Sequence, residues 1–205
     1  MRKRTLFFLS IVLVFFWGTL EYVAAAPPLQ IAVYVDQDLL KSFSGTLSMK
    51  IELAEIFLLA SKHFEEEIGR PLAFSVLGVV EVPHEFMKSG KLNGEFGLRW
   101  LYRRRLEMKE DRLFLIVSMP IFYNEEKNSG LVGPPEQVAI VHYSGSRFET
   151  QITLLHELGH LCGIPEAHAA DSDRDSIMHN SSSLGKTYGK FIPVIKEWCG
   201  ERISH

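Results

Sequence analysis

Two histidines and a glutamate in the stretch LLHELGHLCG (154–163) are the first residues of this chain whose spacing could do chemistry. On an α-helix His156 and His160 lie one turn apart on the same face, where two neutral imidazoles can bind one zinc ion. Glu157 lies beside them, within reach of a water molecule at the metal. The pattern follows an apolar run, which favours a zinc site on a buried helix over two unrelated surface histidines.

The residues that follow extend this pattern. Gly163, three residues past His160, can take a positive φ, end the helix and turn the chain back toward the metal. After a further loop comes Ser-Ile-Met-His, residues 176–179. Taken together, these features resemble the metzincin clan of zinc peptidases, whose pattern continues to a third ligand and a turn that contains methionine. The exported α/β domain and the order of its elements resemble the archaemetzincin-like members.

The resemblance leaves two candidates for the third zinc ligand. The spacing of the clan places it at Glu166, whereas His168, two residues later, supplies the more usual ligand type. Sites with two histidines and a glutamate occur, but imidazole is the commoner third partner. His168 is therefore favoured, and Glu166 is the alternative. The resemblance also implies that Met178 lies in the turn beneath the metal.

Three protein ligands leave a fourth position for water, as in catalytic zinc sites. The resemblance thus implies a zinc metalloendopeptidase with one zinc ion, in which Glu157 activates a zinc-bound water to hydrolyse peptide or protein substrates. An extended substrate would lie along an exposed strand edge, for which residues 131–143 are the best candidate. The alternative is a secreted binding domain that has lost catalysis, which the irregular spacing of the third ligand suggests.

Composition and targeting signals limit the range of possible functions and locations. The 205 residues carry a net charge of -3, too nearly balanced to indicate a nucleic-acid partner. Residues 1–25 combine a basic start, an apolar stretch and small residues, which predicts a signal peptide cleaved after Ala25. An uncleaved membrane anchor over residues 6–26 is the alternative. We expect one secreted or periplasmic, in any case extracytoplasmic, domain over residues 27–205.

The chain has two cysteines, Cys162 and Cys199, which in an oxidising compartment favour one disulfide. At about 100° per residue, Cys162 lies nearly opposite His160 on the helix and therefore faces away from the metal. A disulfide between Cys162 and Cys199 is predicted for an exported chain. Two tyrosines, Tyr143 and Tyr188, have the chemistry to steady an oxyanion, but nothing in the pattern distinguishes them from packing residues.

The elements that position this site follow from apolar periodicity and from turn residues. Strands alternate with helices, which predicts an α/β fold with a mixed, mostly parallel sheet flanked by helices. The active-site helix, the methionine turn and a C-terminal helix complete it. The expected strands are 29–36, 71–82, 112–122 and 137–143; the expected helices are 48–69, 94–110, 148–163 and 183–201; and the expected loop is 124–136.

Overall fold

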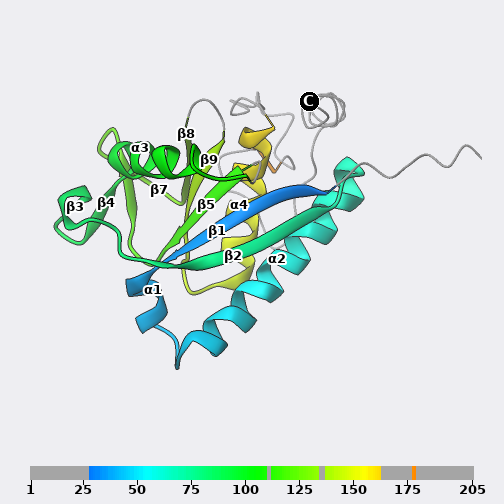
Figure 1. Cartoon of the computed structure of the whole chain (residues 1–205), viewed down its shortest axis with the longest axis horizontal. Coiled ribbons are helices and arrows are strands. Elements are labelled where there is room, and N and C mark those ends of the chain that lie inside the picture. The colour runs from blue at the N-terminus through cyan, green and yellow to red at the C-terminus, as the bar shows by residue number, and fades with distance from the viewer. Residues whose placement is uncertain (1–27, 110–111, 134–136, 163–176, 179–205) are drawn as a thin grey trace, which may run out of the picture.

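A five-stranded sheet forms the centre of the molecule (Figure 1). The computed structural model describes residues 28–109, 112–133, 137–162 and 177–178. In spatial order the strands are β2 (Leu72–Val80), β1 (Leu29–Asp36), β5 (Arg112–Val117), β9 (Val138–His142) and β8 (Gly130–Gly133). The first four run parallel, and β8 is antiparallel to β9. The predicted α/β class with a mostly parallel sheet is confirmed.

The three inner strands are buried because both faces of the sheet are covered. Their near-continuous apolar sequences are typical of parallel strands in that situation. In β5, Phe114 and Ile116 belong to the core cluster on one face, while Leu113 and Leu115 belong to the cluster on the other. Register pairs Phe114 with Val33 of β1 and with Ala139 of β9.

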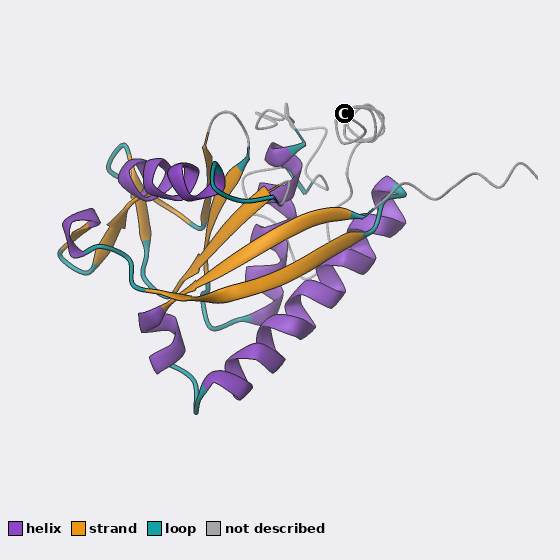
Figure 2. Cartoon of the chain, in the orientation of Figure 1, coloured by secondary structure: helices purple, strands orange, loops and turns teal. Residues whose placement is uncertain are grey.

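Helices lie on both faces of this sheet (Figure 2). Helices α2 (Thr46–Ile68) and α4 (Arg147–Leu161) pack together on one face, and α3 (Gly94–Arg105) covers the other. A short helix α1 (Gln37–Lys41) follows β1, and a 3-10 turn spans His84–Phe86. The helix expected over 48–69 is α2, and Gly69 closes it, since this glycine takes a φ of 83° and its N–H donates to the carbonyl of Glu65 at 2.8 Å.

A second, four-stranded sheet lies at the end of the molecule near α3 (Figure 1). Its order is β3 (Met87–Lys88), β4 (Lys91–Asn93), β6 (Ile121–Tyr123) and β7 (Glu126–Asn128). Strands β6 and β7 form a hairpin with a two-residue turn, Asn124 and Glu125, which both have positive φ. This is the backbone pattern of a type I′ turn.

Three expectations about the elements were wrong. The apolar run 112–122 is two strands, β5 and β6, because Pro120 lacks the N–H that a continuous ladder needs. The expected loop 124–136 contains β7 and β8, which are too short to show alternation in the sequence. The helix expected over 94–110 ends at Arg105.

Other expectations lie outside the described residues. These are the signal segment 1–25, the start of the domain at residue 27 and the C-terminal helix 183–201, and each stays a prediction. Within the described part of the chain, no helix is long and apolar enough to cross a membrane.

Candidate metal centre

Helix α4 carries the His-Glu-x-x-His pattern through the core of the molecule. Its N-terminus is capped by Ser146, whose hydroxyl accepts a hydrogen bond from the Glu149 N–H at 3.3 Å. From Thr150 onward nearly every side chain is buried, between the sheet on one side and α2 on the other. A helix packed on this many sides holds its side chains in fixed positions, as a metal site requires.

The two histidines of α4 face each other. The Nε2 atoms of His156 and His160 are 3.0 Å apart, and their rings meet edge to face with centroids 4.6 Å apart. The other ring nitrogen of His156, Nδ1, lies 2.9 Å from the carbonyl oxygen of Ile177. Because a carbonyl only accepts hydrogen bonds, Nδ1 carries the proton, and the lone pair of Nε2 is directed toward His160.

This geometry fits a zinc ion. Two imidazole nitrogens, each 2.0–2.1 Å from a tetrahedral zinc, would lie about 3.3 Å apart, close to the separation observed. A backbone carbonyl that orients a histidine through its second nitrogen is the usual support of a metal ligand. Among the described residues no group of three His, Cys, Asp or Glu side chains could hold a metal. Both candidates for the third ligand, His168 and Glu166, lie outside those residues, so that choice stays a prediction.

Two residues of the predicted methionine turn lie against α4. Ile177 and Met178 occupy a turn, and both are fully buried. Met178 belongs to the same core cluster as Leu155 and Leu158 of α4. The carbonyl of Ile177 supports His156. The structure therefore brings together His156, His160 and the Ile177–Met178 pair, which the sequence separates by a loop.

Glu157 lies under the edge strand β8 and is only 3% exposed. Its neighbour there is Gly130, the first residue of β8. A Cβ atom on Gly130 would lie 2.6 Å from Cδ and 2.7 Å from Cγ of Glu157. Gly130 could not be singled out from the sequence, because it falls within the expected loop 124–136, where glycine is an ordinary turn residue.

Cys162 is the C-cap residue of α4 and faces the core. It is buried, packs with Leu158 and Leu161, and is disulfide-bonded. Its predicted partner Cys199 lies outside the described residues, so the pairing stays a prediction.

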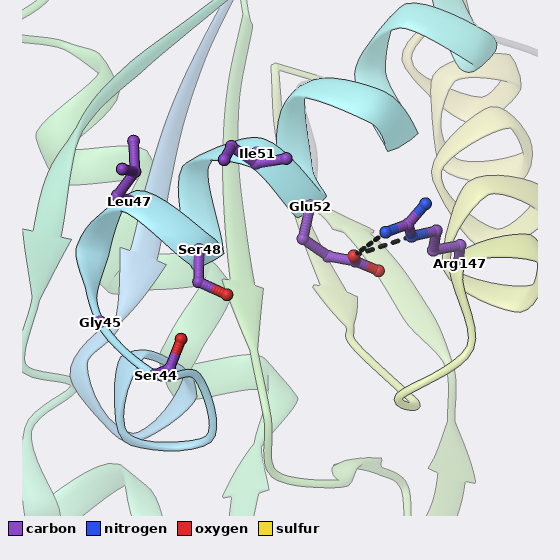
Figure 3. Close-up of a pocket in the computed structure, with 7 residues that line it drawn as sticks. All are labelled: Ser44, Gly45, Leu47, Ser48, Ile51, Glu52 and Arg147. Atoms are coloured by element: carbon purple, nitrogen blue, oxygen red, sulfur yellow. Dashed lines mark hydrogen bonds and ion pairs between the residues drawn. The ribbon is translucent and has the colours of Figure 1, made fainter.

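The N-terminal end of α4 carries a separate polar cluster around Glu52 (Figure 3). Arg147 binds Glu52 through Nη2 at 2.6 Å and also forms an ion pair with Glu55. Tyr143 donates its hydroxyl to Glu52 Oε1 at 3.2 Å. The hydrogen bond from Arg147 holds the pKa of Glu52 below its ordinary value.

A shallow pocket of about 470 Å³ opens beside this cluster (Figure 3). It is lined by Ser44, Gly45, Leu47, Ser48, Ile51, Glu52 and Arg147. Arg147 precedes His156 by nine residues, about 13 Å along the helix axis. Tyr143 therefore belongs to the Glu52 cluster and does not reach the histidine pair. Tyr188 lies outside the described residues.

His142, at the end of β9, has a structural role. Its Nε2 lies 3.2 Å from the carbonyl oxygen of Ser118, which follows β5. Burial lowers the pKa of His142, so the neutral ring is favoured. The ring links the ends of two neighbouring strands.

Comparison with solved structures identifies the fold. The chain is similar to the archaemetzincin of Methanopyrus kandleri, with a TM-score of 0.66 and 19% sequence identity, over 89% of this chain and 99% of the other. The chain has an archaemetzincin-like fold.

Two further solved structures agree with this fold. The chain is similar to a zinc-dependent peptidase from Methanocorpusculum labreanum, with a TM-score of 0.58 and 15% identity. It is also similar to the archaemetzincin of Archaeoglobus fulgidus, solved with malonate, with a TM-score of 0.54 and 14% identity. Both likenesses cover 82% of this chain and 99% of the other. No family model and no curated protein matches the sequence.

The strand order narrows the substrate edge that was expected at residues 131–143. Residues 131–143 were expected to present one free edge, but β9 lies inside the sheet between β5 and β8. Only β8, among the described strands on that side, has an open edge. The edge is thus four residues long, and it begins above Glu157.

Proposed function

We propose that the chain is a zinc-dependent peptidase that hydrolyses peptide bonds within peptide or protein substrates. The observation that carries this proposal is the pair of Nε2 atoms 3.0 Å apart, with Nδ1 of His156 bonded to a backbone carbonyl. Such an arrangement turns the lone pair of His156 Nε2 toward the ring of His160. The fold, shared with structures of zinc-dependent peptidases, supports the same reading.

The residues that would hold one zinc ion are His156, His160 and a third ligand, His168 by preference or Glu166. When bound there, zinc supplies a Lewis acid that polarises a carbonyl and lowers the pKa of water toward about 7. Glu157 follows His156 directly on α4, between the two histidines in the sequence. Glu157 accepts the proton of the attacking water and passes it to the leaving amine.

The open edge of β8 is the proposed substrate-binding site. One side of β8 is hydrogen-bonded to β9, through pairs such as Leu131 with Ile140. No other described strand pairs with its other side, where an extended peptide would add to the sheet as a further strand. A peptide held there would pass over Glu157, because β8 begins directly above that side chain.

The test compares cleavage with metal content in the full chain. Wild type and Glu157→Ala are incubated with a peptide library, and products are read by mass spectrometry. Glu157→Ala should retain zinc and lose hydrolysis by several orders of magnitude, since the base does not ligate the metal. Glu149→Ala, an exposed glutamate on the same helix, is the matched control and should cleave normally. Full activity in Glu157→Ala would contradict the mechanism.

One observation favours a second candidate, a secreted binding domain without catalysis. The third ligand falls either at Glu166 or, two residues late, at His168, and a site that has lost catalysis often departs from the usual spacing first. Zinc binding without cleavage of any library peptide by the wild type would favour this candidate.

We also propose that the chain is exported, by a signal peptide over residues 1–25. Residues 6–26 would instead serve as a membrane anchor if no cleavage occurs. The test is N-terminal sequencing of the protein recovered from the extracytoplasmic fraction. A first residue at Ala26 supports the signal peptide, while an intact Met1 in the membrane fraction supports the anchor.

A further inference from the structure

Gly130 is the point where the edge strand touches Glu157. A Cβ on this residue would lie 2.6 Å from Cδ of Glu157, and such separations are essentially never seen for real Cβ atoms. The backbone itself does not require glycine here, because the φ of Gly130 is not among the positive values that favour it. Space, and not backbone conformation, therefore limits a side chain at this position, because the Glu157 carboxyl would have to move to admit one.

Gly130 and Glu157 both lie on elements that other contacts hold in place. The N–H of His142 donates to the carbonyl of Ser129 at 2.8 Å, and Gly130 pairs with Val141, so the start of β8 is fixed to β9. Helix α4 is fixed through Leu154 and Leu158, which are fully buried in the core. Neither the strand nor the helix can withdraw at low cost, so an added methyl group would displace the Glu157 carboxyl.

We propose that Gly130 is a positioning residue for Glu157. By lacking a side chain it lets the edge strand lie directly on the carboxyl and limits the places that this group can take. The inference rests on the proposed function for its catalytic consequence, since Glu157 is the base of that mechanism. The contact itself does not depend on that function.

The first test is Gly130→Ala in the full chain, with zinc content and steady-state kinetics measured together. A shifted base should lower kcat on the order of 100-fold, because a misplacement of about 1 Å has effects of that size. KM and zinc content should change little, since the three atoms nearest the added methyl group all belong to Glu157 and none belongs to His156 or His160. An unchanged kcat, or a loss of zinc that parallels the loss of kcat, overturns the proposal.

Gly78→Ala is the matched control. Gly78 lies in β2, the strand at the opposite edge of the same sheet, and a Cβ there meets nothing within 4 Å. Its φ is likewise not positive. Gly78→Ala and Gly130→Ala both add one methyl group to an edge strand. Only the methyl group of Gly130→Ala crowds Glu157. Gly78→Ala should retain the kcat of the wild type.

The second test needs no substrate. Overpacking should make Gly130→Ala lower the melting temperature by roughly 2 to 10 °C. In a Glu157→Ala background the crowded carboxyl is gone, so Gly130→Ala should lower the melting temperature only slightly in that background. If Gly130→Ala lowers the melting temperature equally in the wild type and in Glu157→Ala, the proposed contact between Gly130 and Glu157 is wrong. A wild type that cleaves no peptide contradicts the proposed function alone, and this coupling then decides the Gly130–Glu157 contact by itself.

Discussion

His156 and His160 present their Nε2 atoms to each other at 3.0 Å on successive turns of α4. Two nitrogens at this distance share a proton or a metal ion, and the carbonyl of Ile177 already takes the Nδ1 proton of His156. The lone pair of His156 Nε2 is therefore directed toward Nε2 of His160, and a cation bound by both rings would lie between these two atoms.

The histidine pair predicts the zinc content of the protein. Purified wild type should hold about one zinc ion per chain after mild dialysis, and His160→Ala should hold much less, because a catalytic zinc needs three protein ligands. Metal analysis by mass spectrometry measures both. His84→Ala is the control, since that histidine is exposed and pairs only weakly with Glu81. Equal zinc in wild type and His160→Ala would rule out the site.

The third ligand can be identified by two substitutions. If His168 closes the site, His168→Ala should weaken zinc binding roughly 10-fold or more, because even residues that only orient ligands contribute about 10- to 100-fold. Glu166→Ala should have the smaller effect. Competition with a chelator of known zinc affinity measures the two constants. A reversed order would assign Glu166, and small, equal effects would show that neither residue closes the site.

Helix α4 and the inner strands could be predicted because the apolar pattern of each segment indicates that it is buried. Apolar residues recur along the helix that was expected over 148–163. Strands β1 and β9 are short apolar runs that must be covered on both faces. The histidine pair could be predicted for the same reason, since His156 and His160 lie within one helix.

Features that depend on pairing over long distances could not be predicted in this way. Gly130 meets Glu157 only because β8 pairs with β9 and α4 packs beneath both. No spacing in the sequence relates residue 130 to residue 157. The hairpin of β6 and β7 did have a local signal, since Asn124 favours the first turn position, but Glu125 in place of glycine obscured it.

The ion pair of Glu52 predicts how stability depends on pH. Its folded-state pKa lies below the ordinary 4.5, chiefly because of the hydrogen bond from Arg147. Glu52 therefore contributes stability above about pH 4.5, and the contribution is lost as pH falls through the folded pKa. Glu52→Gln should lower the free energy of unfolding by about 1 kcal/mol at pH 7, since half of Arg147 is exposed to solvent.

Urea unfolding at pH 7 and at pH 3 measures this effect. The difference between wild type and Glu52→Gln should shrink at the lower pH. Glu66→Gln is the control, because its pair with Lys62 is long, at 3.8 Å, and exposed on both sides. A difference that stays the same at both pH values would show that the ion pair is not its source.

The turn between β6 and β7 predicts a stabilising substitution. Glu125 has a φ of 67°, in the left-handed region where a Cβ crowds the backbone and costs about 1–2 kcal/mol. Glycine avoids that cost but loses about 0.5–1 kcal/mol more chain entropy on folding. Glu125→Gly should therefore raise the free energy of unfolding by about 0.5–1 kcal/mol, and glycine is the residue that type I′ turns prefer at this position.

Glu125→Ala separates backbone strain from charge in the same measurement. It removes the same exposed carboxylate but keeps a Cβ, so its urea midpoint should stay close to that of the wild type. Glu125→Gly alone should shift the midpoint upward. If both variants shift together, the loss of negative charge is the cause. If neither shifts, the positive φ of Glu125 carries no cost in the folded protein.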